Sequence, residues 1–277
     1  MIMKLKSVFA AFVLVLLCAG CAKGPKELVV MSYNVRLSAV DDGENSWSIR
    51  RSATPLMLRS VKPDIIGLQE AMPDQEGYII EQCPEYSAYG VGRNDGADEG
   101  ERMSIVYNSR KLEMKEHGTW WLSETPDVPS VGWDAKYPRT ATWALMKERR
   151  SGKEFYFVDT HLDHRGVQAR INGLKMVVGK IREMNPDIPM FLVGDFNVEP
   201  ADSCLFALDG LMLDSRSTAK ESDETPSFNG FRKAEKIIDY IYYSGIQAPE
   251  SFRVVTESYD NKPFISDHYP IVAKFTF

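Results

Sequence analysis

Short apolar segments, each followed by a carboxylate, amide or imidazole side chain, recur along this chain and constrain its fold more than any other feature. The polar residues that close these segments are Asn34, Glu70, His161, Asp195 and Asn197, and Asp267 and His268 stand directly before the last segment. Polar residues that repeatedly occupy strand ends can converge along one edge of a sheet. The sequence therefore predicts a functional site at such an edge.

The apolar segments have the length and the side-chain pattern of β-strands. The predicted strands are 28–35, 65–68, 86–91, 103–107, 112–121, 142–147, 155–160, 190–193, 237–243, 252–256 and 269–277. Between two of them, residues 90–100 are rich in Gly, Asp and Asn and predict a loop.

Two segments have helical spacing. Apolar residues recur every three to four positions from Val167 to Met184 and predict a helix, which Asn185-Pro186 ends. The segment 47–61 has a similar spacing, but Pro55 within it should kink or shorten the helix. Strands outnumber helices while helices are interspersed among them, so we expect an α/β sandwich rather than an all-β protein or a helical bundle.

Polar motifs extend from Asn34 to His268 without an evident linker, which favours one domain over residues 28–277. The formal net charge is −6 and no dense run of Lys or Arg is present. This argues against tight, nonspecific binding of nucleic acid. A local basic groove remains open, since arginines are scattered through the chain at Arg93, Arg102, Arg139 and Arg165. We expect a monomer.

The N-terminus has the pattern of a secretory signal peptide over residues 1–20. Lysines precede an apolar run over 8–17, and Ala19 and Gly20 stand before Cys21. The run is shorter than the roughly 20 apolar residues that a membrane-spanning helix needs. The segment 17–21 resembles a bacterial lipoprotein box, although Cys18 stands where an aliphatic residue is usual.

We therefore expect a signal peptide of the lipoprotein type, a lipid anchor on Cys21 and a tether over residues 21–27. The protein would then be an exported cell-envelope lipoprotein on the periplasmic or surface face. If Cys21 is not lipidated, ordinary cleavage would leave a soluble periplasmic protein. Beyond this segment only Cys83 and Cys204 remain, and we expect free thiols rather than a disulfide.

The residue types at the strand ends indicate phosphate chemistry. Glu70, Asp267 and Asn34 offer the hard oxygen ligands that suit Mg²⁺ or Mn²⁺, while imidazoles can donate to phosphate oxygens. Hydrolysis of a phosphoester needs neutralised charge, an oriented water and a stabilised leaving oxygen. A zinc site that includes His161 and His164 is the weaker alternative, because hard ligands dominate.

Six short motifs occur in order along nearly the whole chain after residue 27. They are Ser32-Tyr33-Asn34-Val35, Leu68-Gln69-Glu70, Thr160-His161-Leu162-Asp163-His164, Gly194-Asp195-Phe196-Asn197, Ile238-Asp239-Tyr240-Ile241 and Ser266-Asp267-His268-Tyr269-Pro270. This series resembles the endonuclease/exonuclease/phosphatase superfamily, which has the deoxyribonuclease I fold. The stretches 90–107, 118–126 and 138–143 resemble a bacterial exported subgroup. The resemblance implies a four-layer α/β sandwich, with two packed mixed β-sheets flanked by helices.

The resemblance also implies residue roles. Glu70 would bind the metal, helped directly or through water by Asn34 and Asp267. His161 and Asn197 would hold the scissile phosphate.

Asp195 would orient or deprotonate the attacking water. His268, polarised by Asp239, would stabilise the transition state or shuttle a proton. Arg139 would neutralise a phosphate oxygen.

Other residues are expected around the substrate. Glu101 and His164 would shape the rim, and Trp133, in the loop 125–138, is a candidate for substrate contact. Trp120 and Trp143 are expected in the core. The family often has a basic residue directly before Ile-Asp-Tyr; here Lys236 stands one position earlier, so a contact from it is in doubt.

The function expected from these features is metal-dependent hydrolysis of a phosphodiester or phosphomonoester of a small to medium substrate. The substrate classes considered are phosphorylated small molecules, phospholipid head groups and nucleic acids. One alternative is a nonspecific nuclease that acts on DNA or RNA. The other is a noncatalytic ligand-binding lipoprotein, which is disfavoured because every central polar residue is present.

Overall fold

The computed structural model describes residues 27–277, which form two β-sheets with helices outside them. The first sheet contains β1 (Glu27–Asn34), β2 (Ile65–Ala71), β3 (Tyr86–Tyr89), β4 (Arg102–Asn108), β10 (Glu221–Ser222), β12 (Ser251–Val254) and β13 (Ile271–Thr276). Its strand order is β10-β12-β13-β1-β2-β4-β3. The second contains β5 (Leu112–Trp121), β6 (Thr140–Glu148), β7 (Glu154–His161), β8 (Met190–Asp195), β9 (Leu213–Asp214) and β11 (Asp239–Ser244), in the order β5-β6-β7-β8-β11-β9.

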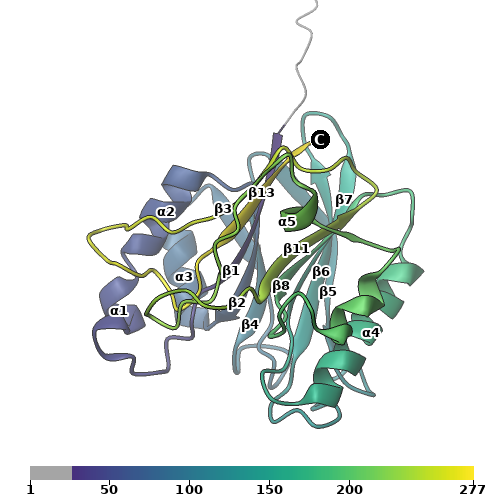
Figure 1. The fold of residues 1–277 in the computed structure, drawn as a ribbon, viewed down its shortest axis with the longest axis horizontal. Helices are drawn as coiled ribbons and strands as arrows, with labels where there is room; N and C mark the ends of the chain where they lie inside the picture. Colours follow the sequence, from purple (N-terminus) through teal and green to yellow (C-terminus); the bar gives the residue numbers. More distant parts are fainter. Residues whose placement is uncertain (1–26) are drawn as a thin grey trace, which may run out of the picture.

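Helices α1 to α3 lie on the outer face of the first sheet and α4 lies on that of the second, whereas α5 contacts strands of both sheets at one end of the sandwich (Figure 1). They are α1 (Trp47–Arg50), α2 (Ala53–Val61), α3 (Pro73–Gln82), α4 (Val167–Glu183) and α5 (Ser215–Thr218), with short 3₁₀ turns η1 (Gly43–Asn45) and η2 (Ser203–Leu208). This arrangement confirms the expected four-layer sandwich. Among residues 27–277, no helix combines the length and apolarity that crossing a membrane requires.

Three apolar cores separate the four layers. Val30 and Phe157 belong to the core between the sheets, whereas Met31 packs under α2 with Met57. Val158 packs under α4 in the third core. Adjacent residues of one strand thus enter different cores, because successive side chains point to opposite faces of a sheet. Burial of both faces explains why the strands read as nearly continuous apolar runs.

The strand directions bring the polar strand ends to one edge of the sandwich. β1 runs parallel to β2, with Asn34 opposite Gln69. β7 runs parallel to β8, with His161 opposite Asp195. β11 and β13 run antiparallel to β8 and β1, so the segments at their first residues reach the same edge. The convergence predicted from the sequence is therefore a consequence of the pairing.

The predicted helix over 47–61 is divided into α1 and α2. The break falls at Arg51 and Ser52, and Pro55 lies in the first turn of α2, where a missing N–H removes no intrahelical bond. The sequence indicates a helix that begins near Pro73, where α3 starts, but not its extent, because α3 buries only Gln75 and Ile79 and so lacks a clear apolar stripe. The predicted helix 167–184 corresponds to α4.

Strand β2 contains an irregularity at the residue that the sequence places at its end. Its pairing with β4 shifts between Leu68 and Ala71, and Glu70 has a φ of 60°. A bulge leaves the extra residue out of the ladder and changes the direction of its side chain. The left-handed backbone at Glu70 is unfavourable for a residue with a Cβ atom and therefore marks a locally strained position.

Cys83 and Cys204 are both buried and unpaired, which confirms the prediction of free thiols. The signal peptide and all but the last residue of the predicted tether lie outside the described residues.

An acidic side chain is buried between the two sheets. Asp159 is fully buried and accepts a hydrogen bond from Gln69 Nε2 at 2.6 Å, while its Oδ2 has no partner in the part of the chain that the structure describes. Burial raises the pKa of Asp159 well above its usual range, and the bond from Gln69 opposes this only in part. The sheets can approach here because Gly67 has no Cβ, which would lie 2.6 Å from Asp159 Oδ1.

We predict that Asp159→Asn becomes stabilising relative to wild type as the pH rises. A raised folded-state pKa gives stability that is fully present below the unfolded pKa of about 4 and is lost as the pH rises toward the folded value. The unfolding free energy of Asp159→Asn minus that of wild type should therefore increase between pH 5 and pH 8, by at most about 1.4 kcal/mol per pH unit. Urea unfolding at the two pH values measures it. An equal difference at both values would contradict the assignment.

Candidate active site

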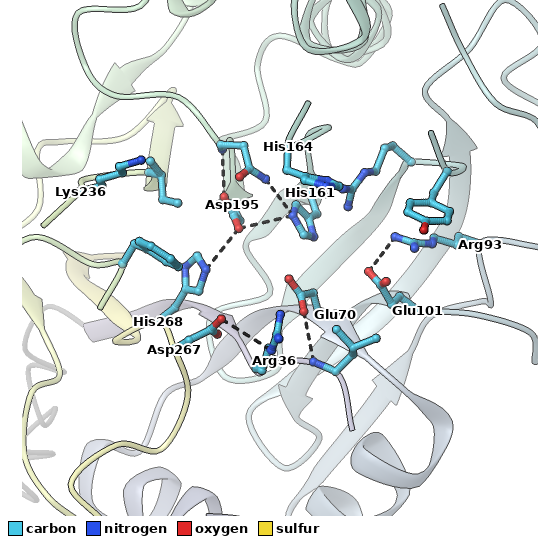
Figure 2. A pocket seen from close by; sticks show the side chains of 16 residues that line it. Arg36, Glu70, Arg93, Glu101, His161, His164, Asp195, Lys236, Asp267 and His268 are labelled. Atoms are coloured by element: carbon cyan, nitrogen blue, oxygen red, sulfur yellow. Dashed lines mark hydrogen bonds and ion pairs between the residues drawn. The ribbon is translucent and has the colours of Figure 1, made fainter. Parts of the chain in front are cut away.

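A cavity of about 440 Å³ opens at the edge where the strand ends converge. All the predicted site residues line it except Asn34, Asp239 and Trp133, and Figure 2 shows the labelled side chains around it. Asn34 and Asp239 lie directly behind the lining and contact residues that form it. Most of the predicted constellation is therefore brought together.

The three tryptophans that the sequence singled out, Trp120, Trp133 and Trp143, all pack against the core under α4. Trp133 is partly buried against the core under α4 and does not line the cavity; Tyr137, from the same loop, does. Trp120 and Trp143 stack with ring centroids 5.7 Å apart and pack against the same core. The structure thus places Tyr137, rather than Trp133, at the wall of the cavity.

The carboxylate of Asp195 is the centre of the site. Its Oδ2 accepts a hydrogen bond from Asn34 Nδ2 at 3.1 Å and lies 3.4 Å from His161 Nε2 and 3.6 Å from His268 Nε2. Its Oδ1 accepts the backbone N–H of Asn197 at 2.9 Å. Burial raises the pKa of Asp195 to about 7, an effect that His268 opposes. This carboxyl is therefore poised to exchange a proton near neutral pH.

His268 and Asp239 form a buried ion pair beside Asp195. His268 Nδ1 lies 2.9 Å from Asp239 Oδ2, and Asp239 pairs with Asp195 across β11 and β8. Burial alone would lower the pKa of His268, but Asp239 and Asp195 raise it well above its usual range. The ring is therefore an imidazolium that directs Nε2 toward Asp195.

His161 is held as a neutral ring. Its Nε2 lies 2.9 Å from Asn197 Nδ2, which fits an amide that donates to the ring nitrogen and leaves the proton on Nδ1. Burial and the nearby Arg139 lower the pKa of His161 well below its usual value. Its Nδ1 is buried and has no hydrogen-bond partner in residues 27–277. A buried donor of this kind requires an acceptor, such as a phosphate oxygen.

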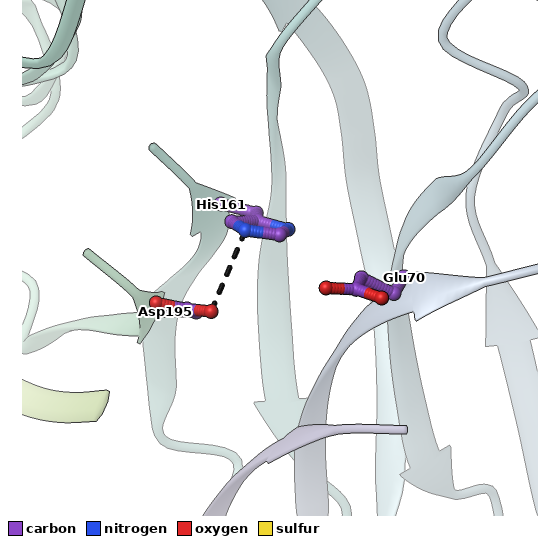
Figure 3. Close-up of side chains that lie close together, drawn as sticks. All are labelled: Glu70, His161 and Asp195. Atoms are coloured by element: carbon purple, nitrogen blue, oxygen red, sulfur yellow. Dashed lines mark ion pairs between the residues drawn. The ribbon is translucent and has the colours of Figure 1, made fainter. Parts of the chain in front are cut away.

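Glu70 faces this group from the first sheet (Figure 3). Its Oε1 accepts a hydrogen bond from Asn34 Nδ2 at 3.0 Å, and its Oε2 accepts the backbone N–H of Leu37 at 3.1 Å. Glu70, His161 and Asp195 each offer one ligand atom, and these atoms lie within 4.8 Å of one another. Two carboxylates and an imidazole at this spacing fit a divalent cation.

Asn34 and Asp267 take other positions around that cluster. Asn34 directs its amide nitrogen at both carboxylates, while its Oδ1 accepts the backbone N–H of Arg36, so it holds the acids in place. Asp267 Oδ2 lies 3.7 Å from Arg36 Nε. Burial raises the pKa of Asp267, and the negative charge of Glu70 adds to this. Carboxylates that repel one another in this way are suited to a bound cation.

Two arginines also line the cavity. Arg139 Nε donates to Asp163 at 3.3 Å, and its Nη2 lies 2.8 Å from His164 Nδ1. Arg93 Nη1 donates to Glu101 at 2.7 Å. Both arginines are buried and paired. Of the scattered arginines in the sequence, Arg102 is instead held by Glu76 and Asp98, and Arg165 does not line the cavity.

Sequence reasoning missed some lining residues. Arg36 directly follows Val35, the last residue of the first motif, and Tyr137 directly precedes the segment Pro138-Arg139. Their adjacency to these motifs was the sequence signal that could have identified them as lining residues. Lys236, whose contact was in doubt, does line the cavity. Arg93 lies in the loop 90–100, whose composition indicates a loop but not the direction of any side chain.

Residues 31–268 match the model of the Endonuclease/Exonuclease/phosphatase family. The match spans most of the chain, and the protein therefore belongs to this family. The family and the neighbours below support a hydrolytic phosphoesterase or nuclease.

Relatives cover nearly the whole chain. A mannosyl-6-phosphatase from Bacteroides thetaiotaomicron VPI-5482 is 34% identical, with a TM-score of 0.86 over 90% of this chain and 100% of that chain. The uncharacterized protein L388 of Acanthamoeba polyphaga mimivirus is 29% identical over 251 residues, 83% of this chain and 92% of L388. TDP2 of D. rerio, complexed with single strand DNA product, is 20% identical with a TM-score of 0.71 over 91% of this chain and 99% of that chain. At that identity the likeness shows the fold alone.

Proposed function

We propose that the protein is a divalent-metal-dependent hydrolase of phosphate esters of small to medium substrates. The observation that carries this proposal is the buried Asp195, held between two histidines and facing Glu70. A bound Mg²⁺ or Mn²⁺, held by Glu70 with Asn34 or Asp267 directly or through water, would supply neutralisation of negative charge on the phosphate. That all central groups converge argues against a noncatalytic binding protein.

The chain's own residues account for substrate orientation and proton transfer. Asp195, with a pKa of about 7, accepts the proton of the attacking water. His161 Nδ1 donates to a phosphate oxygen, while the Asn197 amide donates to His161 Nε2 and to the Leu162 carbonyl and so holds the ring in this orientation. The imidazolium of His268, maintained by Asp239, stabilises the charge that develops on the pentacovalent phosphorus group.

The charge around the cavity supports a small substrate over nucleic acid. The arginines that line the cavity, Arg36, Arg93 and Arg139, are each paired with an acidic side chain, and among the described residues Lys236 is the single lining Lys or Arg without an ion pair. A nuclease needs unpaired cations to track the phosphate backbone. The similarity to a mannosyl-6-phosphatase supports a phosphomonoester, and phospholipid head groups belong to the same size class.

We predict that purified protein hydrolyses p-nitrophenyl phosphate or its bis-ester with Mg²⁺ or Mn²⁺. Treatment with a chelator should reduce turnover to background, and added metal should restore it. Metal should also raise the melting temperature of the chelator-treated protein, because an ion that binds only the native state stabilises it. Full turnover in the presence of chelator would contradict metal dependence.

We predict that Asp195→Asn lowers kcat by about 10³-fold, because a buried amide cannot accept the proton of the attacking water. Asp187→Asn is the matched control, since Asp187 is exposed and lies outside this cavity, and it should keep wild-type turnover. Steady-state kinetics with the aryl ester measures both variants. Turnover of Asp195→Asn within twofold of wild type would refute the role of this carboxylate.

We further propose that the protein is exported and anchored in the cell envelope through a lipid on Cys21. The support is the N-terminal sequence pattern, in which lysines, an apolar run and Ala19-Gly20 precede Cys21.

Expression of the full chain in a bacterial host tests this proposal. Wild type and Cys204→Ser should fractionate with membranes, whereas Cys21→Ser should lose the membrane-bound mature form. Cys204→Ser is the matched control, because the same change is made outside the lipoprotein box. Recovery of wild-type protein in the soluble fraction would contradict the anchor.

A further inference from the structure

The cavity has a second end whose residues the phosphate chemistry does not use. Figure 2 shows Arg93 and Glu101 on the side of the cavity away from Lys236 and His268. Tyr137 lines the same end, with its ring centroid 5.4 Å from the Arg93 guanidinium carbon. The leaving group of a phosphate ester held at Asp195 can therefore extend toward these three residues.

This end is rigidly built. Arg93 and Glu101 are each 8% exposed, and their backbones join through the bond from Arg93 N to Glu101 O at 3.1 Å. Trp121 Nε1 donates to the Arg93 carbonyl at 2.7 Å. Gly92 allows the loop to close, since a Cβ there would lie 2.4 Å from the Glu99 carbonyl oxygen. The loop thus presents a fixed charged pair rather than two mobile side chains.

The pair retains unused hydrogen-bonding capacity. Glu101 Oε2 accepts from Arg93 Nη1, while Oε1 accepts no hydrogen bond from any described residue. Arg93 Nη2 likewise makes no hydrogen bond with any described residue, since the bond to Glu101 uses Nη1. A buried ion pair is expensive unless its remaining donors and acceptors are satisfied. A ligand that both donates and accepts would satisfy them.

We propose that Arg93, Glu101 and Tyr137 form a subsite for the polyhydroxylated part of a sugar phosphate. This inference rests on the proposed phosphoesterase function. A sugar hydroxyl donates to a carboxylate and accepts from a guanidinium, so neighbouring hydroxyls match the fixed pair. The face of Tyr137, which is 40% exposed, offers apolar surface to the C–H groups of a sugar ring.

The charges at this end of the cavity disfavour ligands other than a sugar. Glu101 cancels the charge of Arg93, and a second phosphate or a nucleic-acid backbone would approach its negative carboxylate. A wholly apolar leaving group would leave Glu101 Oε1 buried without a partner, which is unfavourable. A neutral group rich in hydroxyls meets both requirements.

The test compares mannose 6-phosphate and glucose 6-phosphate with p-nitrophenyl phosphate, which has no hydroxyl groups on its leaving group. Glu101→Gln should lower the ratio of kcat/KM for a hexose ester over the aryl ester at least tenfold, because a site built around hydroxyls discriminates through them. Glu99→Gln, on the same loop with an exposed side chain, should leave the ratio unchanged. Tyr137→Ala provides a second variant at an exposed position if Glu101→Gln does not fold.

Isothermal titration of Asp195→Asn with mannose 6-phosphate provides a readout independent of turnover. Binding that falls at least tenfold when Glu101→Gln is added supports the subsite, even if wild type hydrolyses no ester and the proposed function fails. The subsite is overturned if neither hexose phosphate binds. It is also overturned if the ratio of kcat/KM for a hexose ester over the aryl ester changes less than twofold in both Glu101→Gln and Tyr137→Ala while the aryl ester is hydrolysed. Tighter binding of fructose 1,6-bisphosphate than of both hexose monophosphates would overturn it as well.

Discussion

The buried carboxylate of Asp195 depends on more of the fold than any other group in the site. Its partners come from four places in the chain: Asn34 at the end of β1, His161 at the end of β7, Asn197 after β8 and His268 before β13. A carboxylate that is removed from water is stable only when such partners surround it. The buried carboxylate of Asp195 is therefore stable only because the two sheets pack together and bring these partners to it.

The same site contains backbone conformations that local preferences disfavour. Glu70 and Asn197 both have a positive φ, of 60° and 54°. The bulge at Glu70 turns its carboxylate out of the ladder of β2, and Asn34 and the Leu37 N–H then hold that carboxylate in place. Strain of this kind persists where the surrounding contacts over-determine the conformation. Here those contacts are the hydrogen bonds of the acids themselves.

The cavity combines two environments with different chemistry. At one end, burial and neighbouring charges raise the pKa values of Asp195 and His268 and lower that of His161. Asp195 is therefore a proton acceptor, His268 a cation and His161 a neutral donor, although the three side chains lie within a few ångströms of one another. At the other end, Arg93 and Glu101 neutralise each other and present donors and acceptors without net charge. The first end suits a phosphoryl group, and the second suits the group attached to it.

The pattern of apolar strands with interspersed helices by itself indicated an α/β sandwich, and the resemblance of six ordered motifs implied its four layers and most of the residues that line the cavity. The sequence could not locate the break between α1 and α2, the extent of the weakly amphipathic α3, or the bulge at Glu70, since these depend on packing and on strand register. The sequence also could not indicate that Tyr137, rather than Trp133, lines the cavity, or that Arg93 pairs with Glu101. The direction of a loop side chain is decided by long-range contacts, such as the bond from Trp121 to Arg93, that local sequence does not encode.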